Sequence, residues 1–455
     1  MFERIKRIHF VGIGGIGMCG IAEVLINLGY KISGSDLAKS ENVKKLQSLG
    51  ALIEIGHSKS NIKEPHVVVV SSAIEKDNPE VLEAETRRIP VIPRAEMLAE
   101  LMRLKYSICI AGTHGKTTTT SIVGLILDQA GLDPTVVIGG KLKNLENNVQ
   151  LGNGEYIVAE ADESDGSFMH YTPAISIVTN IDDDHLEHYG DMEHLKETFI
   201  EFLNKVPFYG FSILCGDDAN IQSILMRLNK SFKTYGTNSD NYYSSSAIEL
   251  GPERSEYNFL RNGENLGRIT VRCSGMHNVL NSMAASAAAL EMGISFDVIQ
   301  KSVEQYRGVG RRLEKCAEAG DVIIYDDYAH HPTEINISLS SLKKIYPGRR
   351  LIAIFQPHRY TRTRDLYKKF PDSLEIADRL FITDIYGAGE SSIDGVSSRL
   401  ILDASKNKDK ISLIIDIDKL TEAVKKEIRP GDIIITLGAG NIFTVADSLR
   451  KFISK

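Results

Sequence analysis

The chain has 455 residues, of which 42% are hydrophobic and 25% are charged, a composition typical of a globular protein with about three domains. Its 53 Lys and Arg residues are outnumbered by 60 Asp and Glu residues, and the formal net charge of −7 argues against binding to nucleic acid or to an anionic membrane. Five scattered cysteines, none in a C-x-x-C pair, argue against a disulfide framework or a zinc site and fit a cytoplasmic protein, while no apolar run approaches the ~20 residues of a membrane helix.

Short apolar strands alternate with amphipathic helices along nearly the whole chain, which favours parallel α/β sheets. In a first domain, 1–105, we expect strands at 7–12, 30–33, 51–55 and 67–71 and helices at 16–28, 41–49, 79–87 and 94–103. In a second, 106–312, we expect strands at 106–112, 156–162 and 174–180, helices at 116–130, 192–205, 276–292 and 295–306, and a polar, strand-like insert at 230–273.

The segment 307–320 is rich in glycine and charge and is predicted to be a linker and hinge region. In the third domain, 313–455, we expect strands at 321–328, 350–355, 379–386, 411–416 and 432–438 and helices at 333–345, 362–377, 418–428 and 441–453.

The first motif is GIGGIG at 12–17, which satisfies G-x-G-x-x-G, follows a strand and opens a helix. Asp36 lies about 20 residues further on, as in dinucleotide-binding turns. Glycines let the backbone approach a pyrophosphate, and the helix N-terminus carries a partial positive charge. The motif therefore predicts diphosphate binding, without distinguishing NAD from a nucleotide sugar. The alternative is a tight turn with no ligand.

The second motif, AGTHGKTTTT at 111–120, departs from the Walker pattern because position 110, where that pattern has a glycine, is Ile110. The compact G-x-x-G-K-T still follows an apolar strand and begins a helix, so its amides would face a phosphate. Lys116 supplies a charge for the β- and γ-phosphates and Thr117 a hydroxyl for Mg²⁺. The stretch predicts an ATP site.

Acidic residues follow two neighbouring strands of the predicted central sheet. They are Glu160, Asp162, Glu163 and Asp165 after the first strand and Asp182, Asp183 and Asp184, with His185, after the second. Ligands bind at the carboxyl ends of strands in open α/β sheets, and carboxylates suit Mg²⁺. The cluster predicts a magnesium site, the alternative being solvated acidic loops.

Other polar residues lie at predicted strand ends or helix starts, where a site and a solvated surface are both consistent with the pattern. They are His277, Asn278, Asn281, Arg311, Arg312, Asp326, Asp327, Tyr328, His330, His331, His358, Arg359 and Arg362.

Taken together, these motifs resemble the Mur ligases, ATP-dependent amide-forming enzymes that build the peptide stem of bacterial cell-wall precursors. The match is closest to the branch that adds L-alanine to UDP-N-acetylmuramate. The resemblance rests on HFVGIGGIGMCGIAEVL, AGTHGKTTTT, EADESDGSF, TNIDDDHLEHY, HNVLNSMAA, GVGRRLE, DDYAHHPTEI and FQPHRYTRTRDL. It also accounts for the compact loop, which is the family's own form of P-loop.

The resemblance implies three α/β domains, namely an N-terminal Rossmann-like domain for the UDP-sugar, a central P-loop ATPase-like parallel sheet for ATP and a C-terminal Rossmann-like domain for the amino acid. The implied UDP-sugar residues are Gly12, Gly14, Gly15, Gly17, Asp36 and Ser71. The implied ATP residues are Gly112, Thr113, His114, Gly115, Lys116, Thr117, Thr118, Asn278 and Asn281. The implied ligands of Mg²⁺ or Mn²⁺ are Thr117, Glu160 and His185.

The same resemblance implies catalytic roles for Lys116, Glu160, His185, Arg312 and Asp327, with Arg312 reaching the γ-phosphate. On the side where L-alanine meets the muramoyl group it places Tyr328, His330, His358, Arg359 and Arg362. The implied reaction activates the UDP-N-acetylmuramate carboxylate as an acyl phosphate, in a cytoplasmic monomer or homodimer.

Three other functions fit parts of the pattern. A murein-peptide recycling ligase would attach a tripeptide to the same UDP-sugar, but the unbroken GIGGIGM at 12–18 favours the alanine-adding branch. An NAD-dependent oxidoreductase would use the glycine turn and Asp36, but it would have no use for the predicted ATP site at 111–120. A non-catalytic nucleotide sensor would not need Lys116, Thr117 and the acidic cluster.

Overall fold

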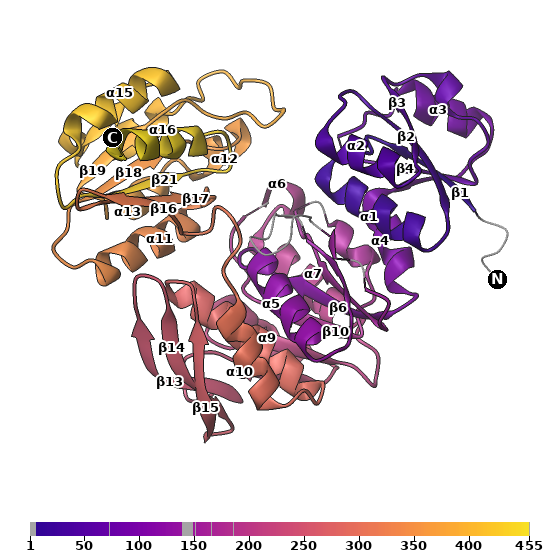
Figure 1. The fold of residues 1–455 in the computed structure, drawn as a ribbon, viewed down its shortest axis with the longest axis horizontal. Helices are drawn as coiled ribbons and strands as arrows, with labels where there is room; N and C mark the ends of the chain where they lie inside the picture. The colour runs from indigo at the N-terminus through magenta and orange to yellow at the C-terminus, as the bar shows by residue number, and fades with distance from the viewer. Residues whose placement is uncertain are drawn as a thin grey trace. The chain divides into compact units, whose positions relative to one another are not determined.

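The structure is a computed structural model that describes residues 6–71, 73–138, 149–150, 152–164, 166–184 and 186–454. It contains three α/β sheets, which Figure 1 shows in chain order from indigo to yellow. The chain divides into two compact units. The first consists of Met1–Ser246, Phe259–Gly267 and Leu280–Val303, and the second of Ala247–Asn258, Arg268–Val279 and Glu304–Lys455. The domain boundaries after residues 105 and 312 remain predictions.

The N-terminal sheet has five parallel strands in the order β3-β2-β1-β4-β5. Its elements are β1 (Arg7–Val11), α1 (Ile16–Asn27), β2 (Lys31–Asp36), α2 (Glu41–Ser48), β3 (Leu52–Ile55), β4 (Val67–Val70), α3 (Pro79–Thr86), β5 (Val91–Pro93) and α4 (Arg94–Met102). The chain runs outward from β1 to β3 and returns to β4 on the other side of β1. The carboxyl ends of β1 and β4 therefore flank a topological switch point, where such sheets bind ligands.

A buried polar network ties α3 to the N-terminal sheet. Glu80, fully buried, accepts hydrogen bonds from His9 Nε2 (2.8 Å), Ser35 Oγ (2.8 Å) and Asn61 Nδ2 (2.8 Å). His57 Nδ1 lies 2.9 Å from Ser35 Oγ and extends the network. Burial alone would raise the pKa of Glu80, but these hydrogen bonds lower it to about 2. The glutamate is therefore ionised inside the domain.

The central sheet has the strand order β15-β14-β13-β12-β11-β10-β6-β9-β7-β8. Its elements are β6 (Tyr106–Ala111), α5 (Lys116–Gln129), β7 (Thr135–Val137), β8 (Val149–Gln150), β9 (Tyr156–Glu160), β10 (Ile175–Val178), α6 (Leu186–Tyr189), α7 (Met192–Leu203), β11 (Phe211–Cys215), α8 (Ala219–Ile224), β12 (Phe232–Tyr235), β13 (Tyr243–Leu250), β14 (Ser255–Arg261), β15 (Glu264–Val271), α9 (Met276–Glu291) and α10 (Phe296–Gln305).

Strand β6 lies between β9 and β10 and runs parallel to both. Because the strand order reverses there, the loop after β6 starts at the switch point of this sheet. The expected strands and helices and the strand-like insert are confirmed. The short elements β7, β8, α6, β11 and α8 are additions, since the sequence pattern did not separate them from loops.

The C-terminal sheet has the order β16-β17-β21-β18-β19-β20, parallel except for the antiparallel pair β16 and β17. Its elements are β16 (Glu314–Ala319), β17 (Val322–Asp327), α11 (Pro332–Ile345), β18 (Leu351–Phe355), α12 (Tyr360–Leu366), α13 (Phe370–Leu374), β19 (Arg379–Ile382), α14 (Arg399–Ala404), β20 (Ile411–Leu413), α15 (Ile417–Glu427), β21 (Ile433–Leu437) and α16 (Phe443–Ile453). Strands β17, β18 and β21 are buried along their whole length, as expected for central strands with helices on both faces.

Two expectations for this region are wrong. The predicted linker at 307–320 contains β16, an edge strand with the sequence EKCAEA. Charges are common on edge strands because they discourage pairing with other chains, so this strand resembles a linker in sequence. The predicted helix at 362–377 is two helices, α12 and α13, and Pro371 lies in the first turn of the second. Proline favours the start of a helix and disfavours its interior.

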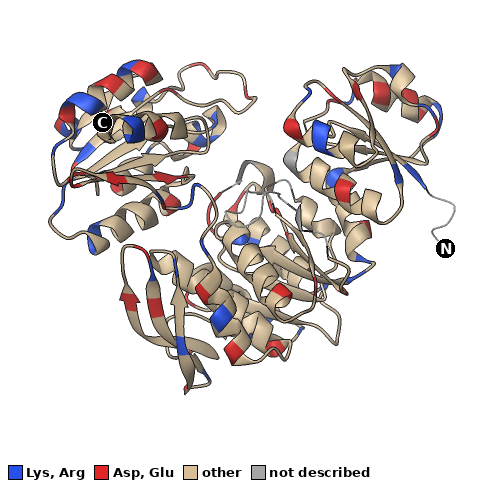
Figure 2. Cartoon of the chain, in the orientation of Figure 1, with Lys and Arg blue, Asp and Glu red and all other residues tan. Residues whose placement is uncertain are grey.

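Among the described residues, no helix is both long enough and apolar enough to span a membrane. Figure 2 shows acidic and basic residues interspersed along the helices and loops.

Candidate active site

The glycine turn follows β1 at the switch point of the N-terminal sheet. Asp36 closes it, because Oδ2 accepts a hydrogen bond from Gly14 N at 2.7 Å. A Cβ built on Gly14 would lie 2.9 Å from that oxygen, so the position excludes a side chain. Ser71, at the end of β4, donates its backbone N–H to Val11 O and brings the second strand end beside the turn. Asp36 thus holds the turn, and its contact with a UDP-sugar remains a prediction.

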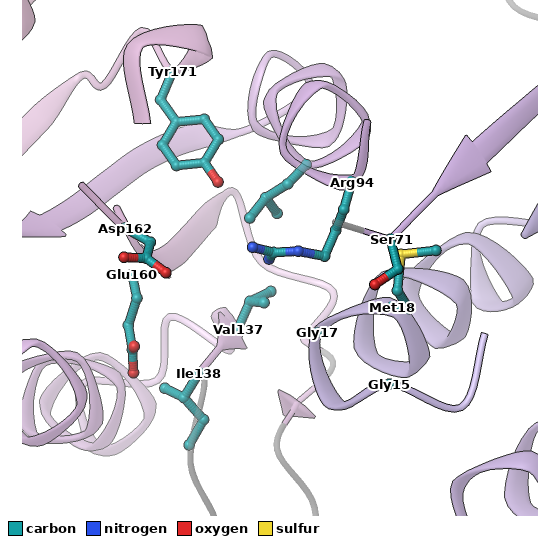
Figure 3. A pocket seen from close by; sticks show the side chains of 11 residues that line it. Gly15, Gly17, Met18, Ser71, Arg94, Val137, Ile138, Glu160, Asp162 and Tyr171 are labelled. Atoms are coloured by element: carbon teal, nitrogen blue, oxygen red, sulfur yellow. The ribbon is translucent and has the colours of Figure 1, made fainter. Parts of the chain in front are cut away.

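A cavity of about 270 Å³ opens beside this turn. Figure 3 shows the guanidinium of Arg94 extending into it, with Ser71 and Met18 on one side and Glu160 and Asp162 on the other. Its lining is completed by Gly15, Gly17, Leu98, Val137, Ile138 and Tyr171.

Arg94 is the charged residue of this lining that was not predicted from the sequence. Its Nη1 would lie 3.0 Å from a Cβ built on Gly17, so the cation sits over the glycine turn. No described residue forms a hydrogen bond or ion pair with its side chain. An unpaired guanidinium over such a turn suits a diphosphate.

The loop after β6 is held by residues at the end of β10. Asn180 Oδ1 accepts from His114 N at 2.8 Å, and Asn180 Nδ2 donates to His114 O at 3.0 Å. The hydroxyl of Thr113 accepts from Asp182 N at 2.9 Å. Gly115 caps α5 with φ of 86°, and a Cβ there would lie 2.5 Å from Asn281 Oδ1. These contacts fix the loop backbone at the N-terminus of α5, the geometry that phosphate binding requires.

Lys116, the first residue of α5, folds back over the loop. Its ammonium donates to both oxygens of Glu163, at 2.9 and 2.7 Å, and to the carbonyl of Gly112 at 2.7 Å. Burial would lower the pKa of Lys116, but the negative charges of Glu163, Asp162 and Glu160 raise it above its usual value. The lysine is therefore charged and lies at the predicted phosphate site. The sequence placed Glu163 in the acidic cluster but not as the partner of Lys116.

The predicted metal ligands are placed in part. Glu160 pairs with Ile110 at the end of β9, beside the start of the loop, and Thr117 follows Lys116 in the first turn of α5. His185 and Asp165 lie outside the described residues. Thr118, also predicted for ATP, is buried in α5.

The start of α9 carries the two predicted asparagines. Asn281 Oδ1 faces Gly115 of the predicted phosphate-binding loop, whereas Asn278 Nδ2 donates to Ser274 O at 2.7 Å and thus closes its own turn. Burial lowers the pKa of the neighbouring His277 to about 4, so this imidazole is neutral.

The two arginines of the RR pair differ in their contacts. Arg311 is anchored to the C-terminal sheet, since it pairs with Asp326 at 2.9 Å and donates to Gly438 O at 2.6 Å. The surface-charge alternative is therefore wrong for Arg311. Arg312 Nη1 lies 3.3 Å from Glu334 Oε1, and the Cζ atom of its guanidinium lies 5.2 Å from the centre of the Tyr328 ring.

Asp327 ends β17 and accepts hydrogen bonds from Ser338 Oγ at 2.6 Å and Ala329 N at 3.0 Å. Burial raises the pKa of Asp327 to about 6, although Ser338 and the charge of Arg312 oppose the shift. The carboxyl group helps to fix the loop that carries Tyr328 and His330.

The residues predicted for the amino-acid side form an aromatic and cationic cluster in the second unit. The rings of Tyr328 and His330 are 5.5 Å apart and those of His330 and His358 are 5.4 Å apart. The ring of His358 stacks on that of Tyr386, with the ring centres 5.8 Å apart and an angle of 11° between the ring planes. His358 Nδ1 lies 3.3 Å from Arg362 Nη1. The structure thus brings these predicted residues together and adds Tyr386.

Arg359 has a strained backbone, with φ of 68° and ψ of 140° at the N-cap of α12. Non-glycine residues rarely adopt such angles, which cost of order 1–3 kcal/mol. Tyr386 holds the conformation, because Arg359 N donates to Tyr386 O and Tyr386 N donates to Pro357 O, both at 2.8 Å. The half-buried guanidinium of Arg359 has no hydrogen-bond or ion-pair partner among the described residues. The conformation therefore presents a cation available to an anionic ligand.

Replacing Arg359 with glycine should stabilise the protein while removing activity. Glycine adopts φ of 68° without strain, so we expect the free energy of unfolding to rise by about 1–2 kcal/mol. Arg359→Ala is the matched control, because it removes the same guanidinium but keeps the Cβ and the strain. Thermal denaturation of the two variants and the wild type checks the ranking. A glycine variant no more stable than the alanine variant would show that the backbone at position 359 is not strained.

Comparisons with known proteins cover almost the whole chain. The family models described as Mur ligase family, catalytic domain, Mur ligase middle domain and Mur ligase, glutamate ligase domain match residues 7–106, 110–289 and 311–440. UDP-N-acetylmuramate–L-alanine ligases of Geobacter sp. (strain M21) and Trichlorobacter lovleyi are each 50% identical to it. They match over 99% of this chain and over 98% and 100% of their own lengths.

Solved structures give the same result. The crystal structure of the UDP-N-acetylmuramate–alanine ligase MurC from Thermotoga maritima matches with a TM-score of 0.81 and 28% identity, covering 99% of this chain and 100% of that one. A murein peptide ligase from Psychrobacter arcticus matches in fold, with a TM-score of 0.70 and 24% identity over 99% of each chain. With three α/β sheets in the expected order and family models along most of its length, the chain belongs to the Mur ligase family.

Proposed function

We propose that the protein is an ATP-dependent ligase that joins L-alanine to the carboxylate of UDP-N-acetylmuramate, giving UDP-N-acetylmuramoyl-L-alanine, ADP and phosphate. The observation that carries this proposal is the 50% identity, over the full length, to enzymes of that name. The placement of Lys116 in a phosphate-binding loop supports it. The same observations favour this activity over a recycling ligase or an NAD-dependent oxidoreductase. A cytoplasmic role in peptidoglycan precursor synthesis follows from the reaction.

The UDP-sugar is proposed to bind at the glycine turn. The cavity there is lined by Gly15, Gly17 and Ser71, and Arg94 supplies an unpaired cation above the turn. Backbone amides and a guanidinium together suit a diphosphate. Glu160 and Asp162 line the opposite wall, so the far end of a bound UDP-sugar would lie near the ATP loop.

ATP is proposed to bind over the 112–118 loop. Lys116 would contact the terminal phosphates and Asn281 the nucleotide, while the N-terminus of α5 adds its partial positive charge. From the family resemblance we retain Arg312 for the γ-phosphate.

The residues around this loop fit a magnesium ion. The carboxylate of Glu160 and the hydroxyl of Thr117 are hard oxygen donors on the elements that flank the loop. We propose that these two residues, with His185, hold Mg²⁺ or Mn²⁺. When bound, such an ion neutralises phosphate charge during phosphoryl transfer.

The proposed mechanism activates a poor acylating agent. A carboxylate oxygen of UDP-N-acetylmuramate attacks the γ-phosphorus of ATP, ADP leaves, and an acyl phosphate forms. The uncharged amine of L-alanine then attacks the acyl carbon, phosphate leaves with its electron pair, and the amine loses a proton. Positioning and charge neutralisation account for most catalysis of such transfers. In this chain Lys116 supplies charge at the phosphates.

The amino acid is proposed to bind at the cluster formed by Tyr328, His330, His358, Arg359 and Arg362. The unpaired guanidinium of Arg359 suits the carboxylate of an amino acid. The rings of His330 and Tyr386 both contact His358, the residue before this cation. We propose that the enzyme is a monomer or a homodimer.

Amino-acid selection tests the function. Glycine lacks one methyl group, worth ~0.8 kcal/mol on burial and roughly 1–3 kcal/mol in a well-fitted pocket, so its kcat/KM should be roughly four- to 150-fold below that of L-alanine. Serine should also react weakly, and D-glutamate should be inert. Phosphate release from ATP and UDP-N-acetylmuramate, with each amino acid in turn, measures this. Higher activity with D-glutamate, or with the L-Ala-D-Glu-containing tripeptide, would assign another branch of the family.

A further inference from the structure

Lys116 is fully engaged inside the protein. An ammonium group has three hydrogens to donate. In this structure Nζ lies within 2.9 Å of both Glu163 oxygens and 2.7 Å from Gly112 O, and 3.3 Å from Thr113 O. The side chain of Lys116 is 15% exposed and that of Glu163 only 2%. No hydrogen of the ammonium is left for a phosphate.

Both partners of this ion pair are held by their surroundings. The carbonyl of Glu163 accepts hydrogen bonds from Tyr189 Oη and, at 3.0 Å, from Gly166 N. The ATP loop is fixed by Asn180, as described above. The pair is thus a contact between two ordered segments, so breaking it has a definite energetic cost. A buried carboxylate that loses its cation is strongly destabilised.

We propose that Glu163 is a positioning residue that keeps Lys116 folded over the loop until a nucleotide polyphosphate takes the lysine from it. The inference rests on the proposed function for the identity of the ligand. The ammonium hydrogens of Lys116 are already donated to the loop carbonyls and to Glu163. Phosphate oxygens must therefore replace these acceptors in order to bind. Nucleotide binding is therefore an exchange of one anionic partner of Lys116 for another.

This exchange lowers nucleotide affinity. In the free protein the pair is satisfied, whereas in the complex Glu163 is buried beside phosphates of like charge. Both effects oppose binding, and both depend on the charge of Glu163. Removing that charge should therefore tighten nucleotide binding, although it also removes an interaction that stabilises the free protein. A residue with a purely structural role would give the opposite sign for binding.

The test is Glu163→Gln, with ADP as the probe in EDTA, so that neither ligation nor a metal enters the measurement. Calorimetry should give a dissociation constant for ADP about tenfold or more below that of the wild type. The melting temperature without nucleotide should fall. Weaker or unchanged ADP binding, alongside the lower melting temperature, would make Glu163 merely structural and would overturn the inference.

The matched control is Asp162→Asn, which removes one negative charge from the adjacent residue without removing the contact to Nζ. It should tighten ADP binding much less than Glu163→Gln, and equal effects would overturn the specific role of Glu163. Glu163→Asp keeps the charge on a shorter side chain and should bind ADP with intermediate affinity, which provides a second measurement if the glutamine variant folds poorly. A wild-type protein that binds no ADP even after Mg²⁺ is added would instead reject the nucleotide site and the proposed function.

Discussion

Replacing Lys116 with alanine should lower the ligation rate by a factor of about 10² to 10³, the usual cost of losing one preorganised electrostatic contact to a transition state. The ammonium donates to Gly112 O and Thr113 O, in the loop backbone that would cradle the phosphates. Phosphate release at saturating ATP, UDP-N-acetylmuramate and L-alanine measures the effect. Near-normal turnover would remove Lys116 from the phosphate site.

The alanine substitution also leaves Glu163 buried without its cation, so lost activity alone does not separate chemistry from folding. The double variant Lys116→Ala with Glu163→Gln removes both charges, and we expect it to regain the stability of the wild type within about 1 kcal/mol. Its activity should stay as low as that of the single variant. Recovery of turnover in the double variant would show that Lys116 acts only through stability. Lys44→Ala, which removes an exposed lysine paired with Glu41, serves as the control.

Backbone-scale features of this protein were predictable because they depend on local pattern. Apolar runs such as VIIYDD and LIAIF are buried along both faces of a sheet, and the structure confirms them as β17 and β18. The two glycine-rich loops follow strands and open helices, as expected. Position at a strand end also predicted which polar residues gather, because parallel strands share one carboxyl edge.

Side-chain partnerships were not predictable in the same way. Arg94 is the first residue of α4, a helix without a motif, and only the fold brings it over Gly17, which is 77 positions away in sequence. Asp36 had the spacing typical of a dinucleotide-binding turn, but the sequence did not predict that its carboxylate accepts a hydrogen bond from Gly14 N. Tyr386 follows a strand in a loop with no motif, and its role depends on the two backbone hydrogen bonds that hold Arg359. Such pairings depend on long-range packing, which periodicity does not encode.

The network around Glu80 is another feature without a sequence signal, and it leads to the largest expected change in stability. Glu80→Ala should lower the free energy of unfolding by about 3–5 kcal/mol, because several hydrogen-bond donors lose their charged acceptor inside the domain. The substitution leaves His9 Nε2 and Ser35 Oγ buried without this acceptor, and it removes one acceptor of the half-buried Asn61 Nδ2. Urea denaturation followed by circular dichroism measures the loss, and hydrogen exchange of β1 locates it. Glu83→Gln, on the same helix in an exposed pair with Arg87, should change stability by less than ~0.5 kcal/mol.

The contribution of Glu80 to the free energy of unfolding should decrease as the pH falls. The pKa of Glu80 is lowered to about 2 from 4.5, so the folded state favours the ionised form. Its contribution is fully present above pH 4.5 and is lost as the pH falls from 4.5 through about 2. A lowering of this size corresponds to about 3 kcal/mol. Other carboxylates titrate in this range, so the difference between the wild type and Glu80→Gln is the quantity to measure. That difference should shrink on acidification, because protonated Glu80 and glutamine are both uncharged. A difference that stays constant between pH 6 and pH 3 would mean that His9 and its neighbours stabilise the neutral carboxyl group as well as the carboxylate.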